Sequence, residues 1–110
     1  MNTLELLDRL VAYPTVSADS NLPLIDFARS YLTERGFECR LVPDGSGSKA
    51  NLFASIGPRG DDGIMLSGHT DVVPAATQVW MSDPFRLTRR GTHLHGRGST
   101  DMKGFLASTL

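Results

Sequence analysis

The sequence has little that would suit a secreted, membrane-bound or nucleic-acid-binding protein. Cys39 is its only cysteine, so an internal disulfide and a thiolate zinc finger are both excluded. The formal net charge is −1, which provides no basic field for nucleic acid or anionic lipid. No apolar run is long enough to cross a bilayer, and the first residues lack the basic-then-apolar order of a signal peptide. These absences predict a cytoplasmic protein with no nucleic-acid or membrane partner.

The chain has enough apolar residues for a packed core, since 40% of its 110 residues are hydrophobic, and this length fits one domain or part of one.

Two helices are predicted near the N-terminus. Asn2 and Glu5 resemble a capping pair ahead of an apolar stripe, and Pro14 ends the helix that they begin. A second helix is predicted between Ser20 or Asn21 and the stop signal at Gly36. Its expected inward stripe consists of Ile25, Ala28 and Leu32.

Strand-like patterns follow the second helix. The predicted strands are 37–42, 51–56, 64–67, 85–87 and 93–95, of which 64–67 is expected to be a buried central strand. A further helix is expected from Asp101 onward. This order of elements indicates an α/β sandwich whose sheet is covered by helices. Residues 105–110 contain no helix stop signal, so residues 1–110 are expected to be a partial domain that is cut within a helix.

A histidine and an aspartate, His69 and Asp71, directly follow the predicted central strand. Residues two apart in an extended segment point to the same side, and ligands usually bind at the carboxyl ends of strands in α/β sheets. A metal-bound imidazole normally has its orientation fixed by a neighbouring group, often a carboxylate, so the pair fits a ligand and its orienter. An ordinary hydrogen-bonded histidine beside a turn-forming aspartate explains the pair equally well.

A second motif, residues 96–104, surrounds Asp101 with glycines. The motif alone favours a tight turn in which Asp101 caps the following helix. A phosphate-binding loop is a weaker alternative, because the third glycine of the dinucleotide fingerprint and the Gly-Lys-Ser/Thr of the P-loop are both missing. A carboxylate at such a turn can also bridge two cations, one through each oxygen.

The two motifs and the residues between them together resemble a known family. The residues that carry the resemblance are, in order, His69-Thr70-Asp71, Trp80, Asp83-Pro84-Phe85 and Asp101 with its flanking glycines. Their order and separation are similar to those of the zinc amidohydrolase/aminoacylase metallopeptidase family. The likeness covers essentially the whole chain, and residues 10–17 with Ser20 and Asn21 look like the opening of the acetylornithine deacetylases in particular.

The resemblance implies the N-terminal part of a zinc-exopeptidase-like α/β sandwich with a mixed central sheet, and it assigns three roles. His69 is implied to bind one of two divalent metal ions, zinc or cobalt. Asp101 is implied to bridge both ions, and Asp71 to be the catalytic-site acid that orients the imidazole. The family pattern also implies a cis peptide bond between Asp101 and Met102, which would be unusual for a residue other than proline.

The implied activity of the complete enzyme is hydrolysis of the amide bond of a small N-acyl amino acid. The leading substrate is N-acetylornithine, cleaved to ornithine and acetate on the way to arginine, by an enzyme that is expected to be a homodimer. Two cations would acidify a bridging water, and a glutamate would accept its proton. That glutamate, the remaining ligands and the lid domain have no counterpart here. His93 and His95 are expected to be exposed or structural rather than ligands.

The sequence leaves three alternatives open. Within the same family, the substrate could be succinyl-diaminopimelate, another N-acyl amino acid or a dipeptide. In a different class, the chain could be a catalytically inactive truncated fragment, because one histidine and one bridging aspartate are too few for a catalytic zinc site. A nucleotide-binding module is a more distant third alternative, which depends on the glycine-rich turn alone.

Overall fold

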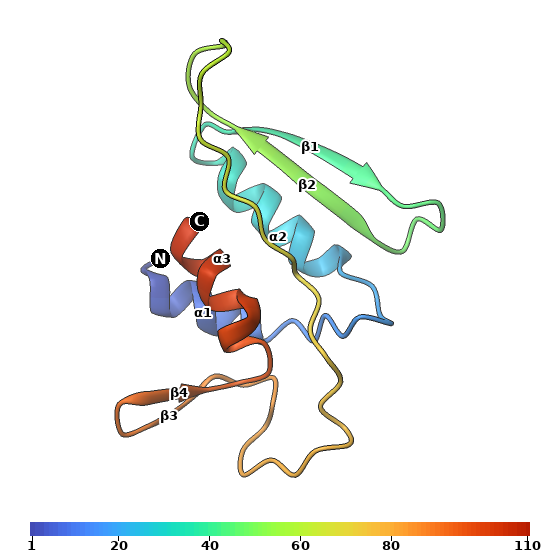
Figure 1. The fold of residues 1–110 in the computed structure, drawn as a ribbon, viewed down its shortest axis with the longest axis vertical. Helices are drawn as coiled ribbons and strands as arrows, with labels where there is room; N and C mark the ends of the chain where they lie inside the picture. Colours follow the sequence, from blue (N-terminus) through green and yellow to red (C-terminus); the bar gives the residue numbers. More distant parts are fainter.

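The computed structural model describes residues 1–110 and begins with the two predicted helices, α1 (Thr3–Val11) and α2 (Leu22–Thr33) (Figure 1). The capping pair is confirmed: the backbone N–H of Glu5 donates to the Asn2 side chain at 3.0 Å, and the Asn2 N–H donates to the Glu5 carboxylate at 2.8 Å. α2 starts after Asn21 with a proline in its first turn, and Gly36 adopts a φ of 86° just beyond its end. No helix is long and apolar enough to span a membrane.

The first predicted hairpin is also confirmed. β1 (Glu38–Pro43) and β2 (Ala50–Ser55) pair in antiparallel fashion, with Glu38 opposite Ser55 and Pro43 opposite Ala50. α2 packs along this hairpin, as Figure 1 shows. The expected stripe of α2, formed by Ile25, Ala28 and Leu32, is buried together with Leu24 and Tyr31.

The predicted central strand at residues 64–67 is wrong for this chain. The segment has no strand partner, and Ile64, Met65 and Leu66 are 93%, 77% and 63% exposed. An apolar run becomes a buried strand only when neighbouring strands satisfy its backbone and cover its faces, and no other segment of the chain supplies them. The segment instead runs extended past α2 in Figure 1 towards residues 69–72, where a parallel bridge between Val16 and Val72 forms.

The second hairpin forms three residues later than predicted on its first side. β3 (Thr88–Arg90) pairs with β4 (His93–His95), whereas residues 83–86 form a turn in which Asp83 accepts hydrogen bonds from the backbone of Phe85 and Arg86. A π-helical turn, η1 (Ser99–Lys103), leads into the last helix, α3 (Gly104–Thr109). The helix expected from Asp101 therefore begins at Gly104, because Asp101 and Met102 have non-helical backbone angles.

The core lies where α1, α2 and α3 meet. It is built mainly from leucines of α1 and α2, and its fully enclosed members include Leu10 and Val11. α3 packs on α1, so the turn that carries Asp101 is fixed to the N-terminal helix (Figure 1). The fold is α/β, with two separate two-stranded antiparallel sheets in place of the single central sheet that was expected.

Candidate metal centre

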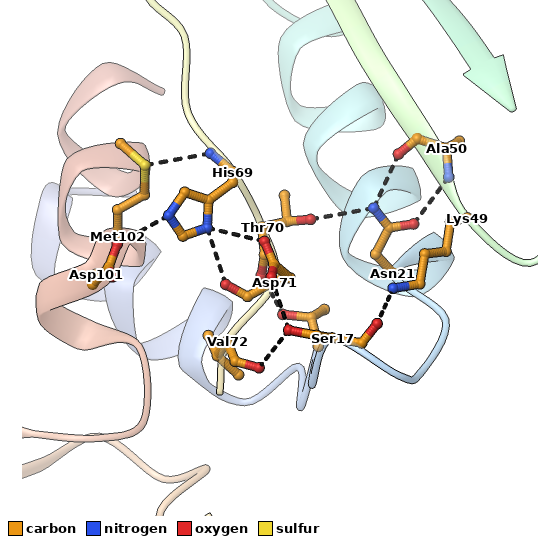
Figure 2. Close-up of polar contacts among 11 residues, drawn as sticks. Ser17, Asn21, Lys49, Ala50, His69, Thr70, Asp71, Val72, Asp101 and Met102 are labelled. Atoms are coloured by element: carbon orange, nitrogen blue, oxygen red, sulfur yellow. Dashed lines mark hydrogen bonds and ion pairs between the residues drawn. The ribbon is translucent and has the colours of Figure 1, made fainter. Parts of the chain in front are cut away.

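His69 and Asp101, which are 32 residues apart in the sequence, lie in direct contact. The Nε2 atom of His69 is 2.9 Å from Oδ1 of Asp101. Figure 2 shows the imidazole reaching from the extended segment towards the turn before α3. Gly68 allows this approach, because a Cβ atom at that position would lie 2.8 Å from the Leu106 side chain and 3.2 Å from that of Met102. The expected association of His69 with Asp101 is therefore present in the fold.

Asp71 contacts the opposite edge of the same imidazole. Nδ1 of His69 is 3.1 Å from Oδ1 of Asp71 and 3.1 Å from its carbonyl oxygen (Figure 2). With Nδ1–H donated to Asp71, the protonated ring donates its Nε2–H to Asp101, and loss of that proton would leave the Nε2 lone pair free for a metal ion. This is the arrangement that a histidine ligand and its orienting carboxylate adopt.

The charges of the three side chains reinforce one another. Burial alone would lower the pKa of His69, but its hydrogen bonds with the Asp71 carbonyl and the Asp101 carboxylate outweigh this and hold the pKa above its ordinary value of 6.5. The hydrogen bond from the Ser17 hydroxyl is the main cause that lowers the pKa of Asp71 below its ordinary 3.8; burial opposes it, and the charge of His69 lowers the pKa further. The aspartate at the orienting position is thus firmly ionised at neutral pH.

The alternative role of Asp101 as a helix cap is wrong. α3 receives no side-chain cap, and the Asp101 carboxylate is directed at His69 instead. The peptide bond between Asp101 and Met102 is cis, as the resemblance implied. Two neighbours hold this turn in place: Gly98 adopts a φ of 77° directly against Val72, and the Lys103 ammonium donates to the Tyr13 carbonyl at 2.6 Å.

Sequence reasoning missed the residues that hold the His69–Val72 segment. Because this segment belongs to no sheet, it is fixed by residues 15–21, the loop between α1 and α2. The hydroxyl of Thr15 donates to the Thr70 carbonyl, and the Val72 N–H donates to the Thr15 carbonyl at 2.9 Å. The Asn21 amide reaches the Thr70 hydroxyl at 3.2 Å (Figure 2). The similarity of residues 10–21 to one group of enzymes was the only signal that pointed to this loop.

The other two histidines take no part in the cluster. His93 and His95 lie on β4, where their ring centroids are 6.5 Å apart. No group of three or more histidine, cysteine or acidic side chains converges on one point anywhere in the chain. Asp71 does not join the other two at a common point, because it lies on the far side of the imidazole.

The donor atoms of His69 and Asp101 are of types that bind zinc, but they are too few to complete a zinc site. An imidazole nitrogen and a carboxylate oxygen are both zinc ligands, and two ligands of one tetrahedral zinc ion stand about 3.4 Å apart when each bond is about 2.1 Å long. The 2.9 Å between His69 Nε2 and Asp101 Oδ1 is a hydrogen-bond distance, so the two atoms would have to move apart by about 0.5 Å to bind one zinc ion together. Catalytic zinc sites use three protein ligands, so at least one further donor is required beyond these two.

Comparison with known proteins shows which sequences this chain is similar to. Residues 65–110 match the model of peptidase family M20/M25/M40. Over 94% of its length the chain is 46% identical to acetylornithine deacetylase of Photorhabdus laumondii, and over 97% it is 40% identical to that of Pasteurella multocida. It spans only 29% and 30% of the lengths of these two relatives. The resemblance read from the sequence is therefore confirmed, and the stretch that matches the model of peptidase family M20/M25/M40 contains His69, Asp71 and Asp101.

Proposed function

We propose that the chain supplies one half of a two-metal site for hydrolysis of the amide bond of an N-acyl amino acid. The observation that carries the proposal is the meeting of His69 and Asp101 at 2.9 Å, with Asp71 on the other ring nitrogen, inside the stretch that matches the peptidase family. Two divalent ions, zinc or cobalt, are the cofactors that this donor chemistry suits.

Each of the three side chains has a separate task in this proposal. His69 would hold one ion through its imidazole, and Asp101 would hold both ions through its carboxylate. Asp71 holds the Nδ1 proton and so keeps the Nε2 lone pair available. When bound, the metal ions would activate a water molecule and polarise the scissile carbonyl. A complete site would also need further ligands and a general base in addition to these three side chains.

The substrate proposed first is N-acetylornithine, because the relatives that align over nearly the whole chain are named acetylornithine deacetylases. The products would be ornithine and acetate, and the complete protein would be a cytoplasmic homodimer. Succinyl-diaminopimelate, other N-acyl amino acids and dipeptides are the alternative substrates. The exposed apolar side chains of Ile64, Met65 and Leu66 support a sandwich in which this segment becomes a strand of a larger mixed sheet.

A chimera tests the proposed site in a complete enzyme. The matching stretch of the Photorhabdus laumondii acetylornithine deacetylase is replaced by residues 1–110, and zinc-dependent release of acetate from N-acetylornithine is measured. We expect activity in the chimera, and we expect His69→Gln and Asp101→Asn each to reduce it by more than the roughly 10- to 100-fold typical of groups outside the metal shell. His95→Gln is the matched control and should leave activity unchanged. Equal losses from all three substitutions would contradict the assignment.

The second candidate is that the chain on its own is inactive, and the count of two converging donors favours it. With too few ligands for a catalytic zinc site, the 110-residue chain should not release acetate from N-acetylornithine when zinc or cobalt is added. Measurable metal-dependent acetate release by the isolated chain would refute this expectation. The chimera distinguishes a functional half-site from an inert remnant, because only the former restores turnover.

A further inference from the structure

The loop after α1 runs beside the metal-binding segment in a fixed register. The Val72 N–H donates to the Thr15 carbonyl at 2.9 Å, and the Ser17 N–H donates to the Val72 carbonyl at 3.0 Å. These two bonds form the parallel bridge between Val16 and Val72. As a result, the Ser17 side chain lies next to the carboxylate of Asp71, 54 residues further along the chain (Figure 2).

The Ser17 hydroxyl has two acceptors within reach and one proton to donate. Oγ is 2.8 Å from Oδ2 of Asp71 and 3.3 Å from the Val72 carbonyl oxygen. The carboxylate is the nearer and the charged acceptor, so it takes the hydrogen bond. With Oδ2 occupied in this way, Oδ1 is left for Nδ1 of His69, from which it is 3.1 Å distant.

We infer that Ser17 is a positioning residue for the metal site: its hydroxyl fixes the rotamer of Asp71, and Asp71 in turn fixes the imidazole of His69. Four side chains from three separate segments thereby form one line of contacts, Ser17 to Asp71 to His69 to Asp101. The inference rests on the proposed metal site and adds the residue that sets its geometry from outside. Orientation of this kind matters because partners of metal-bound histidines govern metal affinity.

The contribution of Ser17 is to orientation rather than to folding. Its side chain is exposed, as is the Asp71 carboxylate that it contacts, and exposed polar contacts contribute little to the free energy of unfolding. The backbone bond from Ser17 to Val72 does not involve the side chain and persists when the hydroxyl is removed. The carbonyl of Ser17 is held separately by the Lys49 ammonium.

The test measures side-chain rotamers in the metal-free 110-residue chain by nuclear magnetic resonance. Three-bond couplings of Asp71 and His69 report how far each side chain occupies a single χ1 rotamer. In Ser17→Ala we expect the population of the major Asp71 rotamer, relative to the other rotamers, to fall about fivefold. A factor of about five is what the loss of one hydrogen bond of typical net strength produces. Ser17→Thr keeps the hydroxyl and should retain the parent couplings, while the backbone amide spectrum of both variants should remain that of the folded chain.

Ser46→Ala is the matched control, because Ser46 donates to the Asp44 carboxylate at 2.9 Å in the loop between β1 and β2, away from the metal site. It should leave the couplings of Asp71 unchanged. Unchanged Asp71 couplings in Ser17→Ala would overturn the inference, and so would failure of Ser17→Thr to restore them. Loss of the folded amide spectrum in Ser17→Ala would also overturn it, since Ser17 would then act in folding. The samples contain no metal or substrate, so these outcomes are independent of turnover by the chimera.

Discussion

Lys103 offers the most quantitative test of the packing beneath the site, because its ammonium group is buried without a carboxylate partner. Its side chain is 0% exposed, and Nζ donates to the Tyr13 carbonyl at 2.6 Å. Burial lowers the pKa of Lys103 from 10.5 to about 8. Between these two pKa values the unfolded chain binds a proton that the folded chain lacks, so the free energy of unfolding rises as the pH increases through this window.

The size of the rise follows from the two pKa values. Their difference corresponds to about 3.4 kcal/mol at roughly 1.36 kcal/mol per pKa unit, and screening by residual solvent reduces this to about 2 kcal/mol. We expect the free energy of unfolding, measured by urea denaturation with circular dichroism, to increase by about this amount between about pH 7.5 and pH 10.5. Lys103→Met should abolish the increase, because it removes the group that titrates.

The chain offers a matched control, since Lys49 is its only other lysine. Lys49→Met should retain the rise in unfolding free energy between the two pH values. Comparison with the parent chain cancels the contribution of every other group that titrates in this range. If the parent and Lys103→Met depend on pH in the same way, the ammonium is hydrated and the burial of Lys103 against Tyr13 is refuted.

Three further predictions concern the turn, the first helix and the imidazole. Gly98→Ala should lower the free energy of unfolding, measured by urea denaturation, by about 1–3 kcal/mol. The reason is that Gly98 has a φ of 77° and that a Cβ atom there would lie 2.3 Å from Val72 Cγ1. An unchanged denaturation midpoint would contradict this contact. Asn2→Ala should cost about 1 kcal/mol in the same assay through loss of the capping box, and no change would show that the end of α1 frays. Asp101→Asn should lower the pKa of His69, which titration of its ring resonances measures, because the carboxylate favours the imidazolium form. The ion pair of His69 and Asp101 stabilises the folded chain below about pH 6.5, and this stabilisation is lost as the pH rises through the pKa of His69 in the folded chain. If Asp101→Asn left the pKa of His69 unaltered, Nε2 would not be in contact with Asp101.

Features of the fold that depend on a few neighbouring residues could be predicted from the sequence. The capping box at Asn2 and the left-handed glycine at Gly36 are local, because a side chain or a backbone preference within one turn decides them. The segment at residues 64–67 could not be predicted in this way. Its apolar run matched a buried strand, but a strand requires partners, and within residues 1–110 there are none beside it.

The side chains of the site could be predicted from the sequence, but the residues that hold them in position could not. His69, Asp71 and Asp101 belong to residue types whose chemistry singles them out, and the resemblance joined them across 32 positions. Ser17 and its neighbours have no such distinctive chemistry, since hydroxyl residues between two helices are ordinary in loops, and the resemblance of residues 10–21 assigned them no role. Their role depends on the parallel bridge to Val72, a long-range contact that no local pattern in the sequence specifies.

Zinc titration of the metal-free chain, followed through the ring resonances of its three histidines, measures whether His69 and Asp101 bind metal together. We expect zinc to perturb His69 at Nε2 at lower concentrations than it perturbs His93 or His95, and we expect Asp101→Asn to remove this selectivity. An equal response of all three imidazoles in the parent chain, or a selective response of His69 that persists in Asp101→Asn, would contradict a metal site shared by His69 and Asp101.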